Sequence, residues 1–472
     1  MTETKHVQIP VGNDRLDLSR PHFVGIGGVG MSALARMLVE QGAQVSGSDL
    51  NTTDVTEHLV AAGCRIHAGH HVSHLKEPSV VVWSSVIAED NLELAAARSA
   101  GIAIAHRSHV LAQLMNDGGR RSVVVAGTHG KSTTTAMLAA ALGQRDPSWA
   151  GGGALLDGTN AHHGAGDVFI AEGDESDRSI THYRPGVAVL LNADHDHPEN
   201  YVDLAETIAV FRDFALAAET LVVSADDPGA RAVTELVRGR EGLRVVTFGQ
   251  SKGADVRVTG IEAAGPCTWV QLEDLDGTPV TLTVRVPGIH NALNAVAAFA
   301  AGRVLGMDAV ELAAGLGGFE GIERRMSLAG TADGVSVYDS FAHHPTAISA
   351  DLAAARTLTT GRTVVVFEPR GWARTAALGA DMGHALAAAD EIVVLPVYST
   401  VSVLAAGIST DEMAKAAVAA GGRVHQVTGL GEAEGVVAGL VRPGDLVLLM
   451  GTGDVNSLGA RILAHRAATV LS

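Results

Sequence analysis

Short runs of β-branched and apolar residues recur along the chain, separated by glycine-containing turns and by longer stretches with a helical composition. Such runs are typical of buried strands, and the stretches between them have the length of helices. The runs occupy residues 79–85, 122–126, 167–172, 187–192, 221–224, 245–248, 363–367, 391–395 and 445–450. This alternation predicts an α/β fold built on parallel, doubly wound sheets.

Three segments of the 472-residue chain each begin with a strand followed by glycine. A chain of this length suits about three domains. Residues 116–119, Asn-Asp-Gly-Gly, are polar and are interpreted as a linker. Near residues 255–286 polar and apolar side chains alternate, which indicates an antiparallel portion inside the second segment. The predicted domains are residues 1–118, 119–326 and 327–472.

Residues 127–133, Gly-Thr-His-Gly-Lys-Ser-Thr, join an apolar strand to the start of a helix. The backbone N–H groups of such a loop and the N-terminus of the helix bind phosphate oxygens. Lys131 can reach the outer phosphates of a nucleoside triphosphate, and the Ser132 hydroxyl can bind Mg²⁺. Gly127 lies three residues before Gly130 rather than five, so this is a shortened phosphate loop. A strand–turn–helix corner with a chance Gly-Lys-Ser is the alternative.

A second glycine-rich turn follows the first predicted strand at residues 25–30, and Asp49 lies further along. Glycines in the pattern Gly-x-Gly-x-x-Gly let a backbone approach a pyrophosphate, and the acid can accept a ribose hydroxyl. Any nucleotide diphosphate would satisfy this pattern, so NAD, NADP and a simple packing turn all remain open on these residues alone. The glycines of this turn are Gly25, Gly27, Gly28 and Gly30.

Carboxylates and histidines gather after two further strands of the second segment. Residues 172–177, Glu-Gly-Asp-Glu-Ser-Asp, carry four carboxylates, and residues 192–197 read Asn-Ala-Asp-His-Asp-His. Neighbouring carboxylates raise one another's pKa unless water or a cation binds them. Beside a phosphate loop we expect that cation to be Mg²⁺. No cysteine or third histidine stands at a zinc-binding spacing, which disfavours zinc, and a solvated acidic turn is the alternative.

The composition excludes several function classes. The formal net charge is −18, and so acidic a chain is not expected to bind nucleic acid or an anionic membrane surface. No apolar run approaches the ~18 residues that a membrane-spanning helix needs, so membrane insertion is not expected. The first residues lack a signal-peptide pattern, and a cytoplasmic location is expected.

Polar and basic residues follow strands in the last part of the chain. Residues 287–291 place an asparagine near a predicted helix start, where it can bind an adenine edge or cap the helix. The arginine pair at 324–325 lies at a predicted domain junction and can reach phosphate or stay solvated. Residues 339–346 contain two histidines before a proline, and residues 367–375 supply two guanidinium groups for a carboxylate or phosphate.

Together and in this order, these motifs resemble those of the Mur ligases of bacterial cell-wall synthesis. The resemblance extends from about residue 20 to residue 460 and includes the shortened loop at 127–131, Thr-Asn-Ala at 159–161 and Ala-His-His-Pro-Thr at 342–346. It implies Rossmann-like N-terminal and C-terminal domains, for the UDP-sugar and the amino acid, flanking a central P-loop ATPase-type domain. It also favours UDP over NAD at the first glycine loop.

The resemblance implies an ATP-dependent ligase that joins L-alanine to the lactyl carboxylate of UDP-N-acetylmuramate, with Mg²⁺ as cofactor. The carboxylate would attack the γ-phosphoryl group of ATP, giving ADP and an acyl phosphate. The amino group of L-alanine would then attack the acyl phosphate and expel phosphate. We expect a monomer or a weak homodimer.

The resemblance also implies roles for individual residues. Lys131, His343 and Arg374 would be catalytic, with His343 as the candidate acceptor of the amine proton. The UDP-sugar would contact Gly25, Gly27, Gly28, Gly30, Asp49, Ser84, Ser85 and Arg107. ATP would contact Gly127, Thr128, His129, Gly130, Lys131, Ser132, Thr133, Asn291, Arg325 and Asp339. Mg²⁺ would bind Ser132, Glu172 and His197, and the amino acid would bind His343, Arg370 and Arg374.

Departures from the family pattern gather in the predicted third domain. Phe341 stands where the family usually has tyrosine, Arg370 replaces a histidine, Gly371 replaces an arginine of some members, and Ser402 replaces an acid. A second hypothesis is therefore a related ligase that joins a different amino acid or amine. An NAD(P)-dependent dehydrogenase and a catalytically silent nucleotide-binding module are further alternatives, which the phosphate loop and the acidic cluster disfavour.

Overall fold

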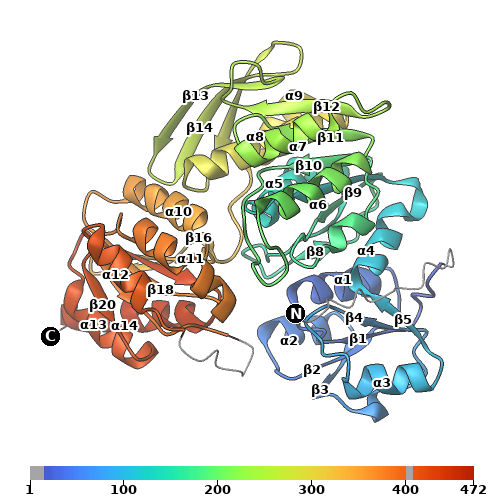
Figure 1. The fold of residues 1–472 in the computed structure, drawn as a ribbon, viewed down its shortest axis with the longest axis horizontal. Helices are drawn as coiled ribbons and strands as arrows, with labels where there is room; N and C mark the ends of the chain where they lie inside the picture. The colour runs from blue at the N-terminus through green and yellow to red at the C-terminus, as the bar shows by residue number, and fades with distance from the viewer. Residues whose placement is uncertain (1–14, 400–407, 472) are drawn as a thin grey trace. The chain divides into compact units, whose positions relative to one another are not determined.

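The computed structural model describes residues 15–399 and 408–471, so Ser402 lies outside the described residues. Contacts divide the chain into two compact units, Met1–Gly118 and Gly119–Ser472. The described residues form three sheets, which Figure 1 shows with the helices around them. The predicted α/β fold class is confirmed.

The first unit contains a parallel five-stranded sheet in the order β3-β2-β1-β4-β5. The strand order reverses between β1 and β4, and ligands of such sheets bind at the carboxyl ends of the strands at this point. The glycine turn at residues 25–30 leaves β1 there. The elements are β1 (Pro21–Val24), α1 (Val29–Glu40), β2 (Ser46–Asp49), α2 (Asp54–Ala61), β3 (Arg65–Ala68), β4 (Val80–Trp83), α3 (Leu92–Ser99), β5 (Ala103–His106) and α4 (Arg107–Asn116).

The second sheet has ten strands in the order β15-β14-β13-β12-β11-β10-β6-β9-β7-β8. Its last three strands along the chain pair antiparallel, as predicted for residues 255–286. The strands are β6 (Arg121–Ala126), β7 (Ser148–Ala150), β8 (Ala161–His162), β9 (Val168–Glu172), β10 (Val187–Leu190), β11 (Thr220–Ser224), β12 (Arg244–Gly249), β13 (Val256–Ala264), β14 (Cys267–Glu273) and β15 (Pro279–Val284).

Strand β6 is paired in parallel with β10 on one side and β9 on the other. The loops that follow these three strands therefore leave the same edge of the sheet. Helix α8 (Ile289–Val304) is buried along most of its length and packs against α5 (Lys131–Ala141), because its many alanines allow a close approach. The other helices of this part are α6 (Leu204–Leu216), α7 (Pro228–Val237) and α9 (Ala309–Gly317).

The third sheet has six strands in the order β16-β17-β21-β18-β19-β20, all parallel except the β16–β17 pair. The loops after β17, β18 and β21 leave one edge of it. The elements are β16 (Arg325–Ala332), β17 (Val335–Ser340), α10 (Pro345–Leu358), β18 (Thr363–Glu368), α11 (Trp372–Leu386), β19 (Glu391–Val394), α12 (Asp411–Ala419), β20 (Val424–Gln426), α13 (Leu430–Leu440), β21 (Leu446–Gly451) and α14 (Leu458–Leu471).

None of the helices in the described part of the chain combines the length and apolar character needed to cross a bilayer.

Candidate functional site

The shortened loop between β6 and α5 adopts a backbone shape that depends on its glycines. Gly127 has φ +140° and Gly130 has φ +83°, and both values lie in the region that favours glycine. A Cβ on Gly127 would also approach the backbone of Asn192 to 3.1 Å. The loop is fixed by two reciprocal bonds: the N–H of His129 donates to Asn192 Oδ1 at 2.8 Å, and Asn192 Nδ2 donates to the His129 carbonyl at 3.1 Å.

The ammonium group of Lys131 is enclosed by acceptors. Its Nζ donates to the carbonyls of Gly127 at 2.6 Å and Thr128 at 3.1 Å, and lies 2.9 Å from a carboxylate oxygen of Glu175. Burial raises the pKa of Glu175 to about 7, although Lys131 opposes this. Burial by itself would lower the pKa of Lys131, but the carboxylates of Glu175 and Glu172 outweigh this effect, so the pKa is raised and the ammonium stays charged. The lysine is thus a localised cation at the mouth of the phosphate loop.

Two of the three predicted Mg²⁺ ligands lie together. Ser132, in the first turn of α5, donates its hydroxyl to Glu172 Oε1 at 3.1 Å, and the other oxygen of Glu172 accepts the N–H of Gly152 at 2.6 Å. Glu172 is the last residue of β9, which explains why it reaches the start of α5. Hydroxyl and carboxylate oxygens are ligands that Mg²⁺ prefers, so this pair fits that ion.

The third predicted ligand, His197, is directed at other carboxylates. Its Nδ1 lies 3.1 Å from Glu199 Oε1, and its Nε2 lies 3.8 Å from Asp196 Oδ2. With φ +55°, His197 also has a backbone conformation that few non-glycine residues adopt. The structure therefore brings Ser132 and Glu172 together and places His197 in a neighbouring ion-pair group.

Arg374 joins that group from a distant part of the chain. Its Nε donates to Asp196 Oδ1 at 2.7 Å, and only 5% and 7% of the two side chains are exposed. Burial opposes the charge of Asp196, but Arg374 and His197 hold the pKa of this carboxyl below its usual range. Within the described residues, Nη2 of Arg374 is a buried donor without a hydrogen-bond partner. A buried unsatisfied donor is a ready position for a ligand oxygen.

His343 lies near the same arginine. Its Nδ1 is 2.7 Å from the carbonyl of Phe341, which places the proton on Nδ1 and leaves Nε2 as an acceptor. Burial and the charge of Arg374 lower the pKa of His343 well below its usual range, so the ring is neutral. Arg370 is exposed and belongs to a short bridge with Tyr398 at the start of the loop after β18.

Two predicted ATP residues lie at the starts of α8 and β16. Asn291 lies in the first turn of α8, where its amide donates to the Pro287 carbonyl at 2.7 Å and accepts from Asn294 at 3.2 Å, so Asn291 is not the N-cap of that helix. A Cβ on Gly130 would meet Asn294 Oδ1 at 2.6 Å. The guanidinium of Arg325 lies over the ring of Phe341 at 5.0 Å. Thr128 and Thr133 are buried.

Asp339 is a buried carboxylate near the end of β17. Its Oδ2 lies 3.5 Å from Arg324 Nε, whereas its Oδ1 is buried without a hydrogen-bond partner in the described structure. Burial raises the pKa of Asp339 from 3.8 to about 6, against the attraction of Arg324. Arg324 itself donates to the carbonyls of Gly451 and Gly453.

This shift predicts a pH dependence of stability. Because the folded-state pKa of Asp339 is raised, its favourable contribution is complete below about pH 4 and is lost as the pH rises through about 6. Between pH 4 and pH 7 the stability of the wild type should therefore fall by up to about 3 kcal/mol more than that of Asp339→Asn. Melting temperatures of both proteins across this range check the difference, and parallel curves would contradict it.

In the first unit, the glycine turn and Asp49 lie together. The N–H of Gly27 donates to Asp49 Oδ2 at 2.9 Å, so the carboxylate that the spacing assigned to a ribose hydroxyl also holds the turn. A Cβ on Gly30 would lie 3.5 Å from the guanidinium of Arg107. The hydroxyl of Ser85 lies 3.1 Å from His106, which precedes Arg107, and the neighbouring Ser84 is buried. Gly25, with φ +78°, and Gly28 complete the turn.

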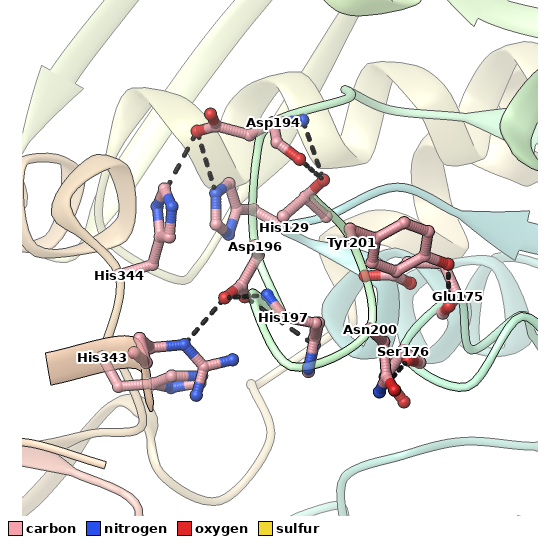
Figure 2. A network of polar contacts seen from close by, with 12 residues as sticks. His129, Glu175, Ser176, Asp194, Asp196, His197, Asn200, Tyr201, His343 and His344 are labelled. Carbon is pink, nitrogen blue, oxygen red and sulfur yellow. Dashed lines mark hydrogen bonds and ion pairs between the residues drawn. The ribbon is translucent and has the colours of Figure 1, made fainter. Parts of the chain in front are cut away.

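Two residues that contact these groups, Glu175 and Asp196, were not predicted. Glu175, the partner of Lys131, was visible only as one of four acids in the cluster at residues 172–177. Asp196 lies in the motif at residues 192–197, but its partner Arg374 is 178 residues away, and no periodicity signals such a contact. Figure 2 shows Asp196 and His197 with Glu175 and Tyr201.

Comparisons with known proteins match nearly the whole chain. Family models described as "Mur ligase family, catalytic domain", "Mur ligase middle domain" and "Mur ligase, glutamate ligase domain" match residues 20–118, 125–302 and 324–453. The UDP-N-acetylmuramate–L-alanine ligase of Streptomyces avermitilis is 48% identical over 454 residues, which cover 94% of this chain and 97% of the relative. The enzyme of that name from Saccharopolyspora erythraea is 43% identical over 461 residues, with coverages of 95% and 93%.

A solved structure agrees with these matches. The crystal structure of UDP-N-acetylmuramate–alanine ligase from Thermotoga maritima has a TM-score of 0.81 and 29% identity, and the match covers 95% of this chain and 99% of that one. Sequence identity above 40% over nearly the full length of both chains, together with this structural match, shows common ancestry of all three parts. The chain belongs to the Mur ligase family.

Proposed function

We propose that this protein is an ATP-dependent amide ligase that joins L-alanine to the lactyl carboxylate of UDP-N-acetylmuramate in the synthesis of peptidoglycan precursors. The observation that carries the proposal is the 48% identity with a ligase of that name along 94% of the chain, combined with the enclosed Lys131 and the Ser132–Glu172 pair of the phosphate loop. The segments 1–118, 119–326 and 327–472 would bind the UDP-sugar, ATP and the amino acid, respectively.

ATP is assigned to the loop after β6. The N–H groups of that loop and the start of α5 would bind the phosphates, and Lys131 would pair with the γ-phosphate. Since Lys131 now donates to Gly127, Thr128 and Glu175, the incoming phosphate would replace at least one of these acceptors. Asn291, Arg325 and Asp339 are assigned to the adenosine side.

Mg²⁺ is assigned to Ser132 and Glu172, whose oxygens already lie 3.1 Å apart. The side chain of His197 would have to turn away from Glu199 to join this set. Of the three ligands, His197 is therefore the one that this structure positions least well for the metal. A bound Mg²⁺ would neutralise part of the negative charge of the phosphates. The chain's own contribution is to hold Ser132 and Glu172 beside Lys131.

The reaction would proceed in two steps. The lactyl carboxylate attacks the γ-phosphoryl group, so that ADP leaves and an acyl phosphate forms. The neutral amine of L-alanine then attacks the acyl carbon, phosphate leaves, and the amine loses a proton. His343 is neutral and carries a free Nε2, so it is assigned as the acceptor of that proton. The unpaired Nη2 of Arg374 is assigned to the carboxylate of the amino acid.

The UDP-sugar is assigned to the turn that leaves β1. Its pyrophosphate would lie against the turn and α1, with Asp49 and Arg107 beside it, and with Ser84 and Ser85 at the end of β4. This position corresponds to the switch point of the first sheet, where ligands of such sheets bind.

The experiment that tests the function is a phosphate-release assay. The protein is incubated with ATP, Mg²⁺, UDP-N-acetylmuramate and single amino acids or amines from a panel. Release that depends on the UDP-sugar and is fastest with L-alanine supports the proposal. Release that requires a different amine supports the second candidate, a related ligase, which the departures at Phe341, Arg370 and Gly371 favour. No release with any combination would contradict both.

Arg370 gives a sharper prediction for the amino-acid site. If its guanidinium binds the amino-acid carboxylate together with Arg374, Arg370→Ala should raise the KM for L-alanine by about 10-fold or more, because a hydrogen bond to a charged group contributes about 1.5–3 kcal/mol. The KM for ATP should stay constant. Arg461→Ala, which removes an exposed arginine from α14, is the matched control. An unchanged KM for L-alanine in Arg370→Ala would remove this residue from the site.

A further inference from the structure

Three metal-ligating side chains from separate parts of the chain converge beside the phosphate loop. His129 belongs to that loop, Asp194 follows β10, and His344 precedes α10. Their ligand atoms all lie within 4.8 Å of one another. Figure 2 shows a dashed line from Asp194 to each of the two imidazole rings. None of the three has been assigned to Mg²⁺ above.

The spacing of these atoms suits a small cation. The distances from Asp194 Oδ2 are 3.4 Å to His129 Nε2 and 3.7 Å to His344 Nδ1. Around a tetrahedral Zn²⁺ with bonds of about 2.0–2.1 Å, neighbouring ligand atoms lie about 3.3–3.5 Å apart. The two imidazole rings, with centroids 4.7 Å apart and planes inclined by 43°, are tilted and not stacked in parallel. Small movements of these side chains would therefore bring all three ligand atoms to bonding distance from one Zn²⁺ ion.

In His344 the nitrogen that faces Asp194, Nδ1, is the one with a lone pair available for a metal ion. Its Nε2 lies 3.2 Å from the carbonyl of His195, so Nε2 bears the proton and Nδ1 faces Asp194. A metal-binding histidine commonly has its second nitrogen held in this way by a carbonyl. Burial and the proximity of His129 lower the pKa of His344, which keeps the ring neutral. His129 and Asp194 are partly exposed, so an ion can enter from solvent.

We propose that His129, Asp194 and His344 form a binding site for a divalent transition-metal ion such as Zn²⁺, with a fourth position open to water or to an anionic ligand. Two imidazoles and one carboxylate favour Zn²⁺ or a similar transition metal over Mg²⁺, which prefers oxygen ligands. The site is thus chemically distinct from the Ser132–Glu172 pair.

Metal binding would replace or share three existing hydrogen bonds. The bond between His129 Nε2 and Asp194 Oδ2, at 3.4 Å, would be given up, because His129 Nε2 must present its lone pair to the ion. The N–H of Thr346 donates to His344 Nδ1 at a long 3.3 Å, and this bond would be given up. The Thr346 hydroxyl donates to Asp194 Oδ2 at 2.6 Å, and the carboxylate has further lone pairs for the metal. Since His129 lies in the phosphate loop and His344 at the start of α10, a bound ion would tie these two segments together.

The test is the binding of Co²⁺ and Zn²⁺ to the full chain without nucleotide. Co²⁺ reports a four-coordinate site by its visible absorption, and Zn²⁺ should displace it. His344→Asn is the informative variant, because asparagine can still accept the N–H at the start of α10 but supplies no imidazole. We expect wild-type protein to bind one ion more than His344→Asn and to gain melting temperature with Zn²⁺, whereas the variant does not.

His384→Asn, which changes an exposed histidine of α11, is the matched control and should bind as the wild type does. A second variant, Asp194→Asn, should weaken Co²⁺ binding at least 10-fold. These variants distinguish metal bound at the proposed site from metal bound by other histidines, such as the group around Glu93 in the first unit. Equal Co²⁺ stoichiometry and equal Zn²⁺ stabilisation in wild type, His344→Asn and Asp194→Asn would overturn the proposal.

Discussion

Replacing Lys131 with methionine is expected to lower kcat for ATP-dependent ligation by at least about 10³-fold. The ammonium is the cation closest to the assigned γ-phosphate, and removing a single charge that stabilises a phosphoryl-transfer transition state has effects of about 10³–10⁵-fold. Methionine is unbranched like lysine and only one heavy atom shorter, so lost packing would contribute little. ADP formation in the presence of UDP-N-acetylmuramate and L-alanine measures the effect.

The same substitution leaves Glu175 buried without its partner. Removing one member of a buried ion pair costs about 3–5 kcal/mol, so the melting temperature should also fall. The double variant Lys131→Met/Glu175→Gln should recover much of the lost melting temperature but none of the activity. Lys252→Met, at an exposed position, should change neither. Activity that returned in the double variant would show that Lys131 acts through folding alone.

Arg374→Met should have the second-largest effect. Arg374 is paired with Asp196 in a nearly dry environment and carries the unpaired Nη2 assigned to the amino-acid carboxylate. We expect kcat/KM for L-alanine to fall by about 10²-fold or more, since truncating one partner of a buried, hydrogen-bonded charge pair costs about 2–5 kcal/mol. The free energy of unfolding should fall too, because the carboxylate of Asp196 would remain buried without its ion-pair partner.

Two comparisons separate these effects. Arg356→Met breaks a pair with Asp390 at a similar distance of 2.7 Å but at the surface, and should change the melting temperature by little. Arg374→Met/Asp196→Asn should restore melting temperature and leave the use of L-alanine impaired. If Arg374→Met retained wild-type kcat/KM for L-alanine, the assignment of the amino-acid carboxylate to this arginine would be wrong.

The strand, turn and helix of residues 121–141 could be predicted from sequence because their signals are local. A β-branched strand, glycines at positions with positive φ and the Lys-Ser pair at the start of α5 lie within one short segment. The same holds for the parallel strands, whose continuous apolar runs mark burial on both faces. The antiparallel β13–β15 portion followed from the alternation of polar and apolar residues.

The pairings that complete the site could not be predicted in this way. The contact of Arg374 with Asp196 depends on how α11 packs relative to the loop after β10, and neither segment carries a pattern that encodes it. The sequence disfavoured zinc at His195 and His197, because no cysteine or third histidine stands at a matching spacing. The proposed metal site uses other residues, and in it His344 reaches Asp194 from far along the chain. Local spacing reports only ligands that are near in sequence, whereas the fold brings distant ones together.

The most direct test of carboxylate activation by ATP is to ask whether an oxygen atom of the lactyl carboxylate is transferred to the released phosphate. UDP-N-acetylmuramate with ¹⁸O in its lactyl carboxylate is turned over with ATP, Mg²⁺ and L-alanine, and the released phosphate is examined by mass spectrometry. An acyl phosphate transfers one carboxylate oxygen to phosphate, so we predict one ¹⁸O in each phosphate, with ADP as the second product. Amide formation with unlabelled phosphate, or with AMP and pyrophosphate, would contradict the account.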